Sequence, residues 1–328
     1  MVKKLCFGIA VGLFFVYLSF RGVDPGGIAD GLKGVKLSCI PPVLFLLVFI
    51  QFLRSYRWGI ILKPIRSIDQ GSLFSVTSVG FLAVVAIPAR IGELARPYLI
   101  SAKTGVSMSS AVGTILVERV FDGLSVLAIF FVVVLLMPLP PWLIRGSLFF
   151  LLITLLFLVL MTLLILKREA SLTFIDPFLR RLPERWRLRV VGMIHNLIDG
   201  FKIISDTRSI CYVALLSIVI WVINAVVMYV FFFAFGFDLP FAAALVLLII
   251  IILGIAVPTA PGFVGNWHFF CILGLGLFGI HKADALAYAI VLHFLSIGTI
   301  VLLGIIFLPF NRFSLSDIKG RLSAGRDA

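Results

Sequence analysis

The stretch IPARIGELARPYL (residues 87–99) places charged side chains in the middle of a strongly apolar chain. Pro88 interrupts any helix that runs through it, and Arg90, Glu93 and Arg96 follow at intervals of three residues. On one continuous helix this spacing would align the three charges along a single stripe. Charged side chains inside a membrane are costly and usually face a cavity or a pathway. We therefore expect a break in a membrane-embedded helix here, and a candidate site beside it.

The composition around this stretch is that of a membrane protein. Hydrophobic residues make up 62% of the 328 and charged residues only 13%, and the mean hydropathy is +1.20. Several apolar runs approach or exceed the ~20 residues that a helix needs to cross a bilayer. The sequence therefore predicts an all-α polytopic membrane protein, and it excludes a soluble globular domain.

The formal net charge of +13 has a topological explanation. Lys and Arg gather in the loops of membrane proteins that face the cytoplasm. No folded basic module stands outside the membrane segments, so we expect no nucleic-acid partner. The four cysteines show no CxxC spacing, and we expect packing roles for them, with no metal site and no cofactor.

We interpret six apolar runs as full crossings: about 5–20, 39–53, 111–137, 147–166, 210–235 and 285–308, of which the last four are long and unambiguous. No small-x-small cleavage site follows the first run, so we expect it to stay as an uncleaved helix. Lys3 and Lys4 place the N-terminus in the cytoplasm by the positive-inside rule. The same rule places the basic segments 54–66, 167–208 and 311–328 on the cytoplasmic side. We thus expect a multi-pass protein of the cytoplasmic (inner) membrane with both termini inside.

Two further apolar pieces, 73–100 and 241–280, are each broken in the middle. Only about 15 residues precede Pro88, which favours a re-entrant hairpin over two full spans. The topology requires the first piece to begin and end inside, and the second to begin and end outside. Each half then consists of two helices, a broken pair and a helix, which is the inverted-repeat architecture of transporters. We expect one transmembrane domain over 1–328, with half-repeats 1–137 and 138–310 and a tail, 311–328.

The segment 167–208 is rich in Arg and Lys, and its apolar residues recur at roughly helical spacing. This pattern predicts a basic amphipathic helix on the inner leaflet. An ordinary solvated loop that sets the orientation is the alternative, and the two are compatible.

Arg90, Glu93 and Arg96 allow two interpretations. They could form a self-compensating group that only pins the hairpin. Alternatively, Glu93 neutralises one arginine and orients the other, and the surplus positive charge binds an anion. A guanidinium suits phosphate because its planar fork donates two parallel hydrogen bonds.

The stretch VERVFDGL adds Glu118, Arg119 and Asp122 inside the third full helix, with the two carboxylates at i and i+4. A salt bridge from Arg90 or Arg96 to one of these carboxylates would be structural. A proton- or cation-coupling site is the alternative, since carboxylates in transporters often serve that purpose.

The stretch VPTAPGFVGNWHFF breaks the second piece. Its prolines end one helix and its glycines allow close approach, so the next helix begins inside the membrane. The free N–H groups and the positive dipole end of that helix would favour an anion. A membrane histidine here could be a packing residue or part of the site. The candidates in this half are Pro261, Gly262, Gly265, His268 and His293.

Together, IPARIGELARPYLI, ERVFD and PTAPGFVG resemble the flippase-like transmembrane domain of lysylphosphatidylglycerol synthases over about residues 5–310. The resemblance implies translocation of a phospholipid or related lipid between leaflets. Many members carry a glutamate where this chain has His268, which puts any inherited role of that position in doubt. The chain continues only about twenty residues beyond its last helix. The resemblance is therefore to a stand-alone member, without the synthase domain that transfers aminoacyl groups.

These features favour a flippase or transporter of an anionic or phosphate-bearing lipid, either a phospholipid or a polyprenyl-phosphate-linked glycolipid. A different class is a non-transporting membrane partner that recruits a glycosyltransferase or a lipid-modifying synthase. A third possibility is a membrane-embedded transferase. The sequence shows no nucleotide-binding or metal-ligand spacing that would support it, so we expect no enzyme and no catalytic residues. The expected partners are membrane lipids, with a lipid-modifying enzyme and a homodimer left open.

Overall fold

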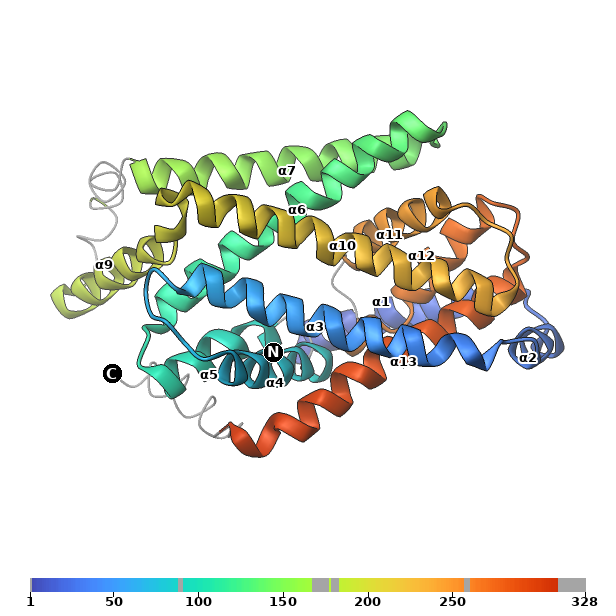
Figure 1. Ribbon diagram of the computed structural model, residues 1–328, viewed down its shortest axis with the longest axis horizontal. Helices are drawn as coiled ribbons and strands as arrows, with labels where there is room; N and C mark the ends of the chain where they lie inside the picture. The colour runs from blue at the N-terminus through green and yellow to red at the C-terminus, as the bar shows by residue number, and fades with distance from the viewer. Residues whose placement is uncertain (1, 88–90, 167–176, 178–182, 257–259, 312–328) are drawn as a thin grey trace.

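The computed structural model describes residues 2–87, 91–166, 177, 183–256 and 260–311, and within these ranges every regular element is a helix (Figure 1). The expected all-α class is therefore confirmed. The α-helices are α1 (Val2–Phe20), α2 (Pro25–Lys33), α3 (Ile40–Leu62), α4 (Gln70–Ala86), α5 (Ala95–Thr104), α6 (Met108–Leu136), α7 (Pro141–Leu166), α9 (Glu184–Asp199), α10 (Thr207–Phe235), α11 (Phe241–Ile255), α12 (Asn266–Gly276) and α13 (Lys282–Phe307). Short 3-10 helices occur at Leu37–Cys39, Ile91–Leu94, Lys202–Ser205, Pro261–Phe263 and Leu308–Phe310.

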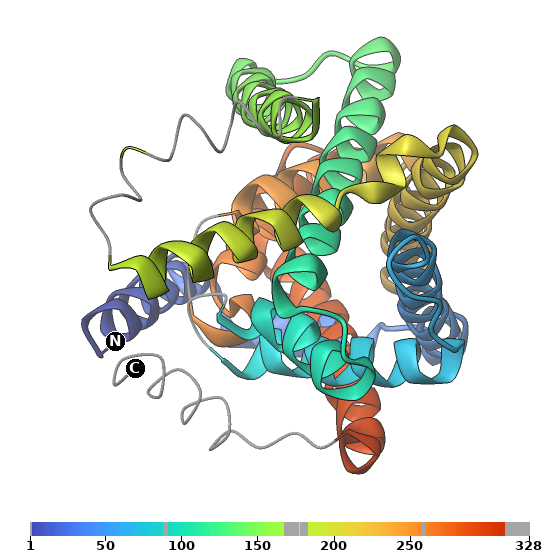
Figure 2. The ribbon, with the colours of Figure 1, turned by 90° about the vertical axis from the view of Figure 1, so that its left-hand side faces the viewer.

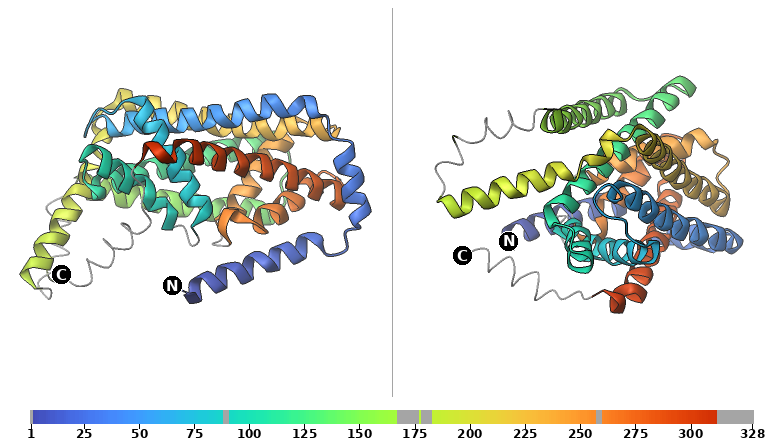
Figure 3. Two further views of the ribbon diagram at one scale, coloured as in Figure 1. Left: turned by 90° about the horizontal axis from the view of Figure 1, so that it is seen from below. Right: turned by 60° about the vertical axis from the view of Figure 1, so that its left-hand side comes forward.

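Five single helices of the described chain are long and apolar enough to cross a membrane, and they match five of the six expected crossings. They are α3, α6, α7, α10 and α13. The sixth expected crossing, at 5–20, falls in α1. The part of α1 from Gly8 to Phe20 qualifies as a crossing only together with α2, and the two helices are bent by 81° at the break between them. Figure 3 shows α1 along one side of the bundle, where it packs against α12.

Both broken pieces contain a first arm that is too short to span a bilayer. Helix α4 has 17 residues and α11 has 15, which correspond to about 25 and 22 Å of helix. The hydrocarbon core is about 30 Å thick. In Figure 1, α4 and α5 lie at the end of the bundle where α3 ends, whereas α11 and α12 lie at the opposite end. This arrangement fits the two expected re-entrant pairs, while the inverted-repeat relation between the halves remains a prediction.

The two halves of the chain are interleaved in space. Helix α3 packs along α10, and α4 packs along α13 (Figure 1). The main apolar core lies among α3, α6, α10, α11, α12 and α13. At its centre Tyr288 packs against Phe231 and Phe232, with ring centroids 5.4 and 5.6 Å apart, and its hydroxyl donates to the Met228 carbonyl at 2.9 Å. By contrast, α7 lies at the edge against α6 and exposes most of its surface (Figure 2).

Helix α9 is the main described element of the basic segment 167–208, of which residues 167–176 and 178–182 lie outside the described chain. It packs against α6, where Gly113 approaches the backbone of Leu197 and Gly200. Its outer face exposes Leu188 and Met193 among arginines, with exposed fractions of 61% and 53%. This is the pattern of an amphipathic interfacial helix. Its position on the inner leaflet remains a prediction.

Candidate functional site

The described part of the 87–99 stretch is not one continuous α-helix. Ile87 has an extended backbone, with φ −102° and ψ 122°, and the described chain resumes in the 3-10 helix Ile91–Leu94, which contains Glu93. Arg96 lies in the first turn of the next helix, α5. Glu93 and Arg96 therefore lie in two successive helical elements, and the common stripe of all three charges stays a prediction. Pro88 and Arg90 lie outside the described residues.

Arg96 forms a two-pronged ion pair with Glu118 of α6. Its Nη1 lies 2.9 Å from Oε1, and its Nη2 lies 3.0 Å from Oε2. The two side chains are only 3% and 1% exposed. The guanidinium also lies 4.3 Å from the centre of the Trp58 ring. Of the ion pairs that the sequence allowed between this stretch and the α6 carboxylates, the one between Arg96 and Glu118 is therefore present.

Arg96 can take this position because residue 80, opposite it on α4, is a glycine. A Cβ at Gly80 would overlap the side-chain carbons of Arg96. The side chain of Trp58 is held in turn, because its Nε1 donates to the Thr114 hydroxyl at 3.1 Å. Three helices thus fix one guanidinium.

Arg57 completes the cluster, and the sequence analysis missed it. Its Nη1 donates to Asp122 Oδ1 at 2.6 Å and to the Ser217 hydroxyl at 2.7 Å, and its Nη2 lies 3.4 Å from Glu118 Oε1. The apolar run of the second crossing ends at residue 53, which assigned Arg57 to a cytoplasmic loop. The helix in fact continues to Leu62. The available signal was RSYRW, whose two arginines stand at i and i+3 beside a tryptophan.

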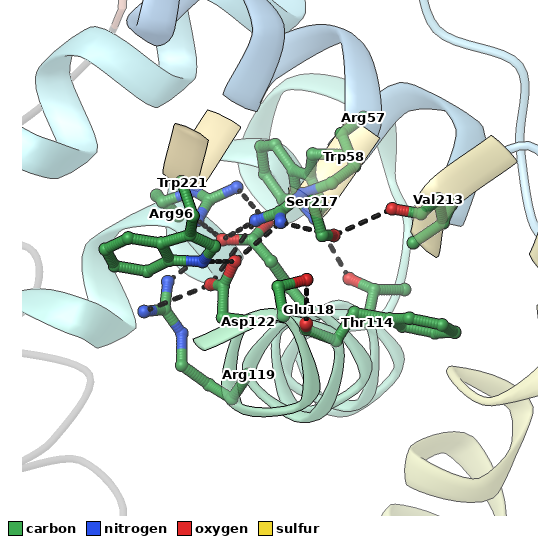
Figure 4. Close-up of polar contacts among 12 residues, drawn as sticks. Arg57, Trp58, Arg96, Thr114, Glu118, Arg119, Asp122, Val213, Ser217 and Trp221 are labelled. Carbon is green, nitrogen blue, oxygen red and sulfur yellow. Dashed lines mark hydrogen bonds and ion pairs between the residues drawn. The ribbon is translucent and has the colours of Figure 1, made fainter. Parts of the chain in front are cut away.

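Figure 4 shows how the two carboxylates of α6 are shared among three arginines. Arg119 bridges them, with Nη2 at 2.9 Å from Glu118 Oε1 and Nη1 at 3.6 Å from Asp122 Oδ2. Trp221 of α10 donates from Nε1 to Asp122 Oδ1 at 3.1 Å. Unlike its buried neighbours, the Arg119 side chain is 45% exposed.

Arg54, one turn before Arg57 on α3, is a fourth arginine in this region. Its guanidinium lies 5.0 Å from the centre of the Phe81 ring. Among the described residues, no carboxylate forms an ion pair with it within 4.0 Å. Arg54, Arg57, Arg96 and Arg119 carry four positive charges. Glu93, Glu118 and Asp122 carry three negative ones; this count covers the described residues and leaves out Arg90.

A cavity of about 300 Å³ opens beside this cluster, between helices of both halves. Its charged lining residues are Arg54, Glu93, Arg96 and Arg119, all from the first half. The second half contributes polar groups, among them Trp221, Asn224, His293, Ser296 and Thr299, and many apolar side chains, among them Val227, Met228, Ile255, Leu292, Ile297, Ile300 and Leu303. The cavity therefore combines guanidinium groups with extensive apolar walls.

The second broken pair contacts His293, which lines the cavity from α13. Gly262 has φ 66° and Gly265 φ 97°, values that favour glycine. His293 Nε2 lies 2.9 Å from the Gly262 carbonyl oxygen, and the Gly265 N–H donates to His268 Nδ1 at 3.4 Å. Because a carbonyl only accepts and an N–H only donates, these contacts require a proton on His293 Nε2 and none on His268 Nδ1. The ring centroids of the two histidines are 4.7 Å apart, and Trp267 stacks on His293 at 5.0 Å.

The sequence profile of the lysylphosphatidylglycerol synthase transmembrane region matches residues 5–304. The chain belongs to this family. It is similar to a UPF0104 membrane protein of Methanothermobacter thermautotrophicus, at 24% identity over 326 residues, covering 94% of this chain and 96% of the relative. A UPF0104 membrane protein of Methanocaldococcus jannaschii is 26% identical over 238 residues, covering 71% and 96%.

In this member of the lysylphosphatidylglycerol synthase transmembrane family, the predicted residues fall into groups. Those that line the cavity are Glu93, Arg96, Arg119 and His293. Those that hold the arginines by ion pairs are Glu118 and Asp122. Those at the second break are Pro261, Gly262, Gly265 and His268. The structure adds Gln51, Arg54, Arg57 and Trp221, which sequence reasoning did not select.

Proposed function

We propose that this protein moves a lipid with an anionic, phosphate-bearing head group between the leaflets of the membrane. The observation that carries the proposal is the cavity between the two halves, where the described arginines Arg54, Arg96 and Arg119 stand beside apolar walls. Membership of the family supports a function connected with membrane lipids.

The head group of a lipid, rather than its tails, is what needs help to pass through the bilayer interior. A phosphate in the bilayer interior without partners is strongly disfavoured, because its charge loses hydration. Guanidinium groups replace water with short, charge-assisted hydrogen bonds. The acyl chains need no such help, since they stay in hydrocarbon or against apolar walls. A cavity of about 300 Å³ suits a head group better than a whole lipid.

The two broken hairpins suit this task because the first arm of each is too short to cross a bilayer. Each ends its first arm partway through, at Ala86 and at Ile255. The cavity is lined by residues from both hairpins, such as Phe81 and Phe263. Movement of one half against the other could open such a cavity to either side in turn, as in other transporters with broken helices.

The test is lipid transfer in vesicles that contain the purified full chain. Fluorescent phosphatidylglycerol is followed by quenching of the outer leaflet, beside protein-free vesicles. Ser296→Phe, which fills the cavity, should abolish the added transfer. Leu302→Phe on the same helix, at a side chain that is 61% exposed, should leave it unchanged.

Wild-type vesicles that transfer no more lipid than protein-free ones would contradict the proposal. The recruiting role, without transport, would then take its place. The surface to examine for that role is α9, with its exposed Leu188 and Met193.

A further inference from the structure

We infer that His293 of α13 binds a proton inside the cavity, and that this proton enters together with the anionic head group of the lipid. The inference rests on the proposed function for the anion, and it adds the ion that accompanies the lipid. Its basis is the pair of His293 with His268 of α12, whose ring centroids are 4.7 Å apart. His293 lines the cavity and is only 7% exposed.

The backbone at the second break fixes one nitrogen of each ring. His293 Nε2 donates to the Gly262 carbonyl at 2.9 Å, and His268 Nδ1 accepts from the Gly265 N–H at 3.4 Å. A neutral imidazole has one N–H and one lone pair. The remaining nitrogens are therefore His293 Nδ1, with a lone pair, and His268 Nε2, with a proton. Neither forms a hydrogen bond with another described residue, so the pair offers one free lone pair, on His293 Nδ1.

His293 can take up a proton without losing a contact, whereas His268 cannot. A proton on His293 Nδ1 leaves Nε2 donating to the Gly262 carbonyl. A proton on His268 Nδ1 would place two donors opposite each other and remove the contact at the start of α12. Trp267 stacks on the His293 ring at 5.0 Å, and an aromatic face attracts a cation. Repulsion between two imidazolium rings at this separation limits the pair to one proton.

Charged groups reach the cavity from several elements and decide when this proton binds. Those that line it are Arg54 of α3, Glu93 of the 3-10 helix Ile91–Leu94, Arg96 of α5 and Arg119 of α6. The carboxylate of Glu93 acts on Arg119. A further positive charge beside guanidinium groups is unfavourable, and apolar walls withhold its hydration. A proton on His293 therefore lacks a counter-charge until an anion enters.

The other described helices around His293 add no charge close to it. Helices α4, α10 and α11 contribute only neutral side chains to the cavity, with Trp221 and Asn224 as the polar ones. Cys271 and Tyr288 belong to the apolar core. The charged and titratable groups that α2 brings to the start of α13 are Asp24, Asp30, His281, Lys282 and Asp284. Even Asp284 precedes His293 by nine residues, or about 13 Å of helix.

An anionic head group supplies the missing counter-charge. His293 Nδ1–H then donates to a phosphate oxygen, and a charge-assisted hydrogen bond of this kind is short and strong. Coupling between two bound species is reciprocal, so an anion that favours the proton is itself favoured by the proton. The anion should therefore bind more tightly as the pH falls. A proton gradient across the membrane would then favour transfer of the lipid in the direction in which protons flow.

The experiment is a calorimetric titration of the full chain, purified in detergent and stripped of lipid, with short-chain phosphatidylglycerol as the probe. The range is about pH 5 to 8, in which the charge of histidine ordinarily changes while that of the phosphodiester does not. Titrations in two buffers of different ionisation enthalpy count the protons taken up. We expect close to one proton per lipid, and an affinity that rises by up to about tenfold for each pH unit of acidification.

Three variants assign the proton to one residue. His293→Gln keeps an amide donor for the Gly262 carbonyl but cannot take up a proton, so binding should lose its pH dependence. His268→Asn keeps an acceptor for the Gly265 N–H, and proton uptake should persist. His281→Gln, at an exposed histidine before α13, is the matched control and should behave like the wild type.

Four results would overturn the inference: lipid binding by the wild type without proton uptake, no lipid binding at the acidic end of the range, proton uptake that survives in folded His293→Gln, or uptake that is lost in folded His268→Asn. If His293→Gln does not fold, the wild type and His268→Asn still decide.

The vesicle assay separates this failure from that of the proposed function. If the wild type transfers lipid but takes up no proton on binding, only the proton site is wrong. If it transfers none yet binds lipid with proton uptake, transport is wrong and the proton site stands.

Discussion

Glu118 of α6 forms ion pairs with three arginines, one each from α3, α5 and α6 itself. This explains how a membrane interior tolerates so many charges. Arg57 and Arg96 lie within 3.4 and 2.9 Å of its Oε1, and Arg119 lies within 2.9 Å. Each charge alone would be expensive in this environment. Shared among facing partners, the charges fix α3, α5 and α6 to one another. The cluster therefore holds the wall of the cavity in place.

Removal of this carboxylate charge should be strongly destabilising. Glu118→Gln leaves buried guanidinium groups without their counter-charge, and we expect the free energy of unfolding to fall by about 3–5 kcal/mol. The measurement is an unfolding titration of the purified chain with a denaturing detergent.

The exposed pair of Lys33 with Asp30 is the matched control for this variant. Its N–O distance is also 2.9 Å, but the side chains are 77% and 75% exposed. Asp30→Asn should change the free energy of unfolding by less than about 1 kcal/mol. If the two substitutions lowered the free energy of unfolding equally, burial would not be the reason for the large effect at Glu118.

At the scale of elements, both breaks carry proline, and the second adds glycines. A residue before proline is restricted to extended conformations, and Ile87 before Pro88 has this geometry. The second break has Pro258 and Pro261 in its sequence, followed by Gly262 and Gly265 with positive φ. A Cβ at Gly265 would overlap the Gly12 carbonyl of α1, so this glycine permits α1 to lie against the break.

Helix α4 is fixed at its other end by an N-cap. The Asp69 carboxylate accepts a hydrogen bond from the Ser72 N–H at 2.7 Å. Asp69→Ala should lower the free energy of unfolding by about 1 kcal/mol, whereas Asp69→Asn should keep the cap. Loss of stability in the Asn variant equal to that in the Ala variant would contradict this assignment.

The cap also has a defined pH dependence. The Ser72 N–H holds the pKa of the Asp69 carboxyl below its ordinary value of 3.8. A lowered pKa means that the stabilisation is present above that ordinary value and is lost as the pH falls through the lowered one. Unfolding titrations on either side of this range should show a smaller acid-induced loss for Asp69→Asn than for the wild type.

At the scale of the whole molecule, basic side chains gather at one end of the bundle. Lys63 and Arg66 follow α3, Lys103 lies in the last turn of α5, and the basic helix α9 lies at the same end (Figure 1). At the opposite end, the connection before α11 and the start of α13 carry both signs, with Asp238 and Asp284 beside Lys282. The positive-inside rule assigns the first end to the cytoplasm. This is the orientation that the sequence predicts.

Labelling of single cysteines in a cysteine-free chain tests that orientation. A membrane-impermeant maleimide applied to intact cells should label Asp238→Cys and should reach Lys103→Cys only after lysis. Both side chains are exposed, so access decides the result. The reversed pattern would show that the protein has the opposite orientation in the membrane. Labelling of both cysteines in intact cells would show that the two ends of the bundle do not lie on opposite sides of the membrane.

The sequence by itself determined the helical class, five of the crossings and the two breaks, and it limited the partners of Arg96 to Glu118 and Asp122. These follow from hydropathy, from proline and glycine, and from the cost of a lone charge in a membrane, all of which act locally. Only the tertiary structure placed Arg57 and Arg54 in the site. Hydropathy ended the second crossing at residue 53, because an arginine there looks like a boundary. The helix continues because α6 and α10 supply Asp122 and Ser217 as partners, and such partners are distant in sequence.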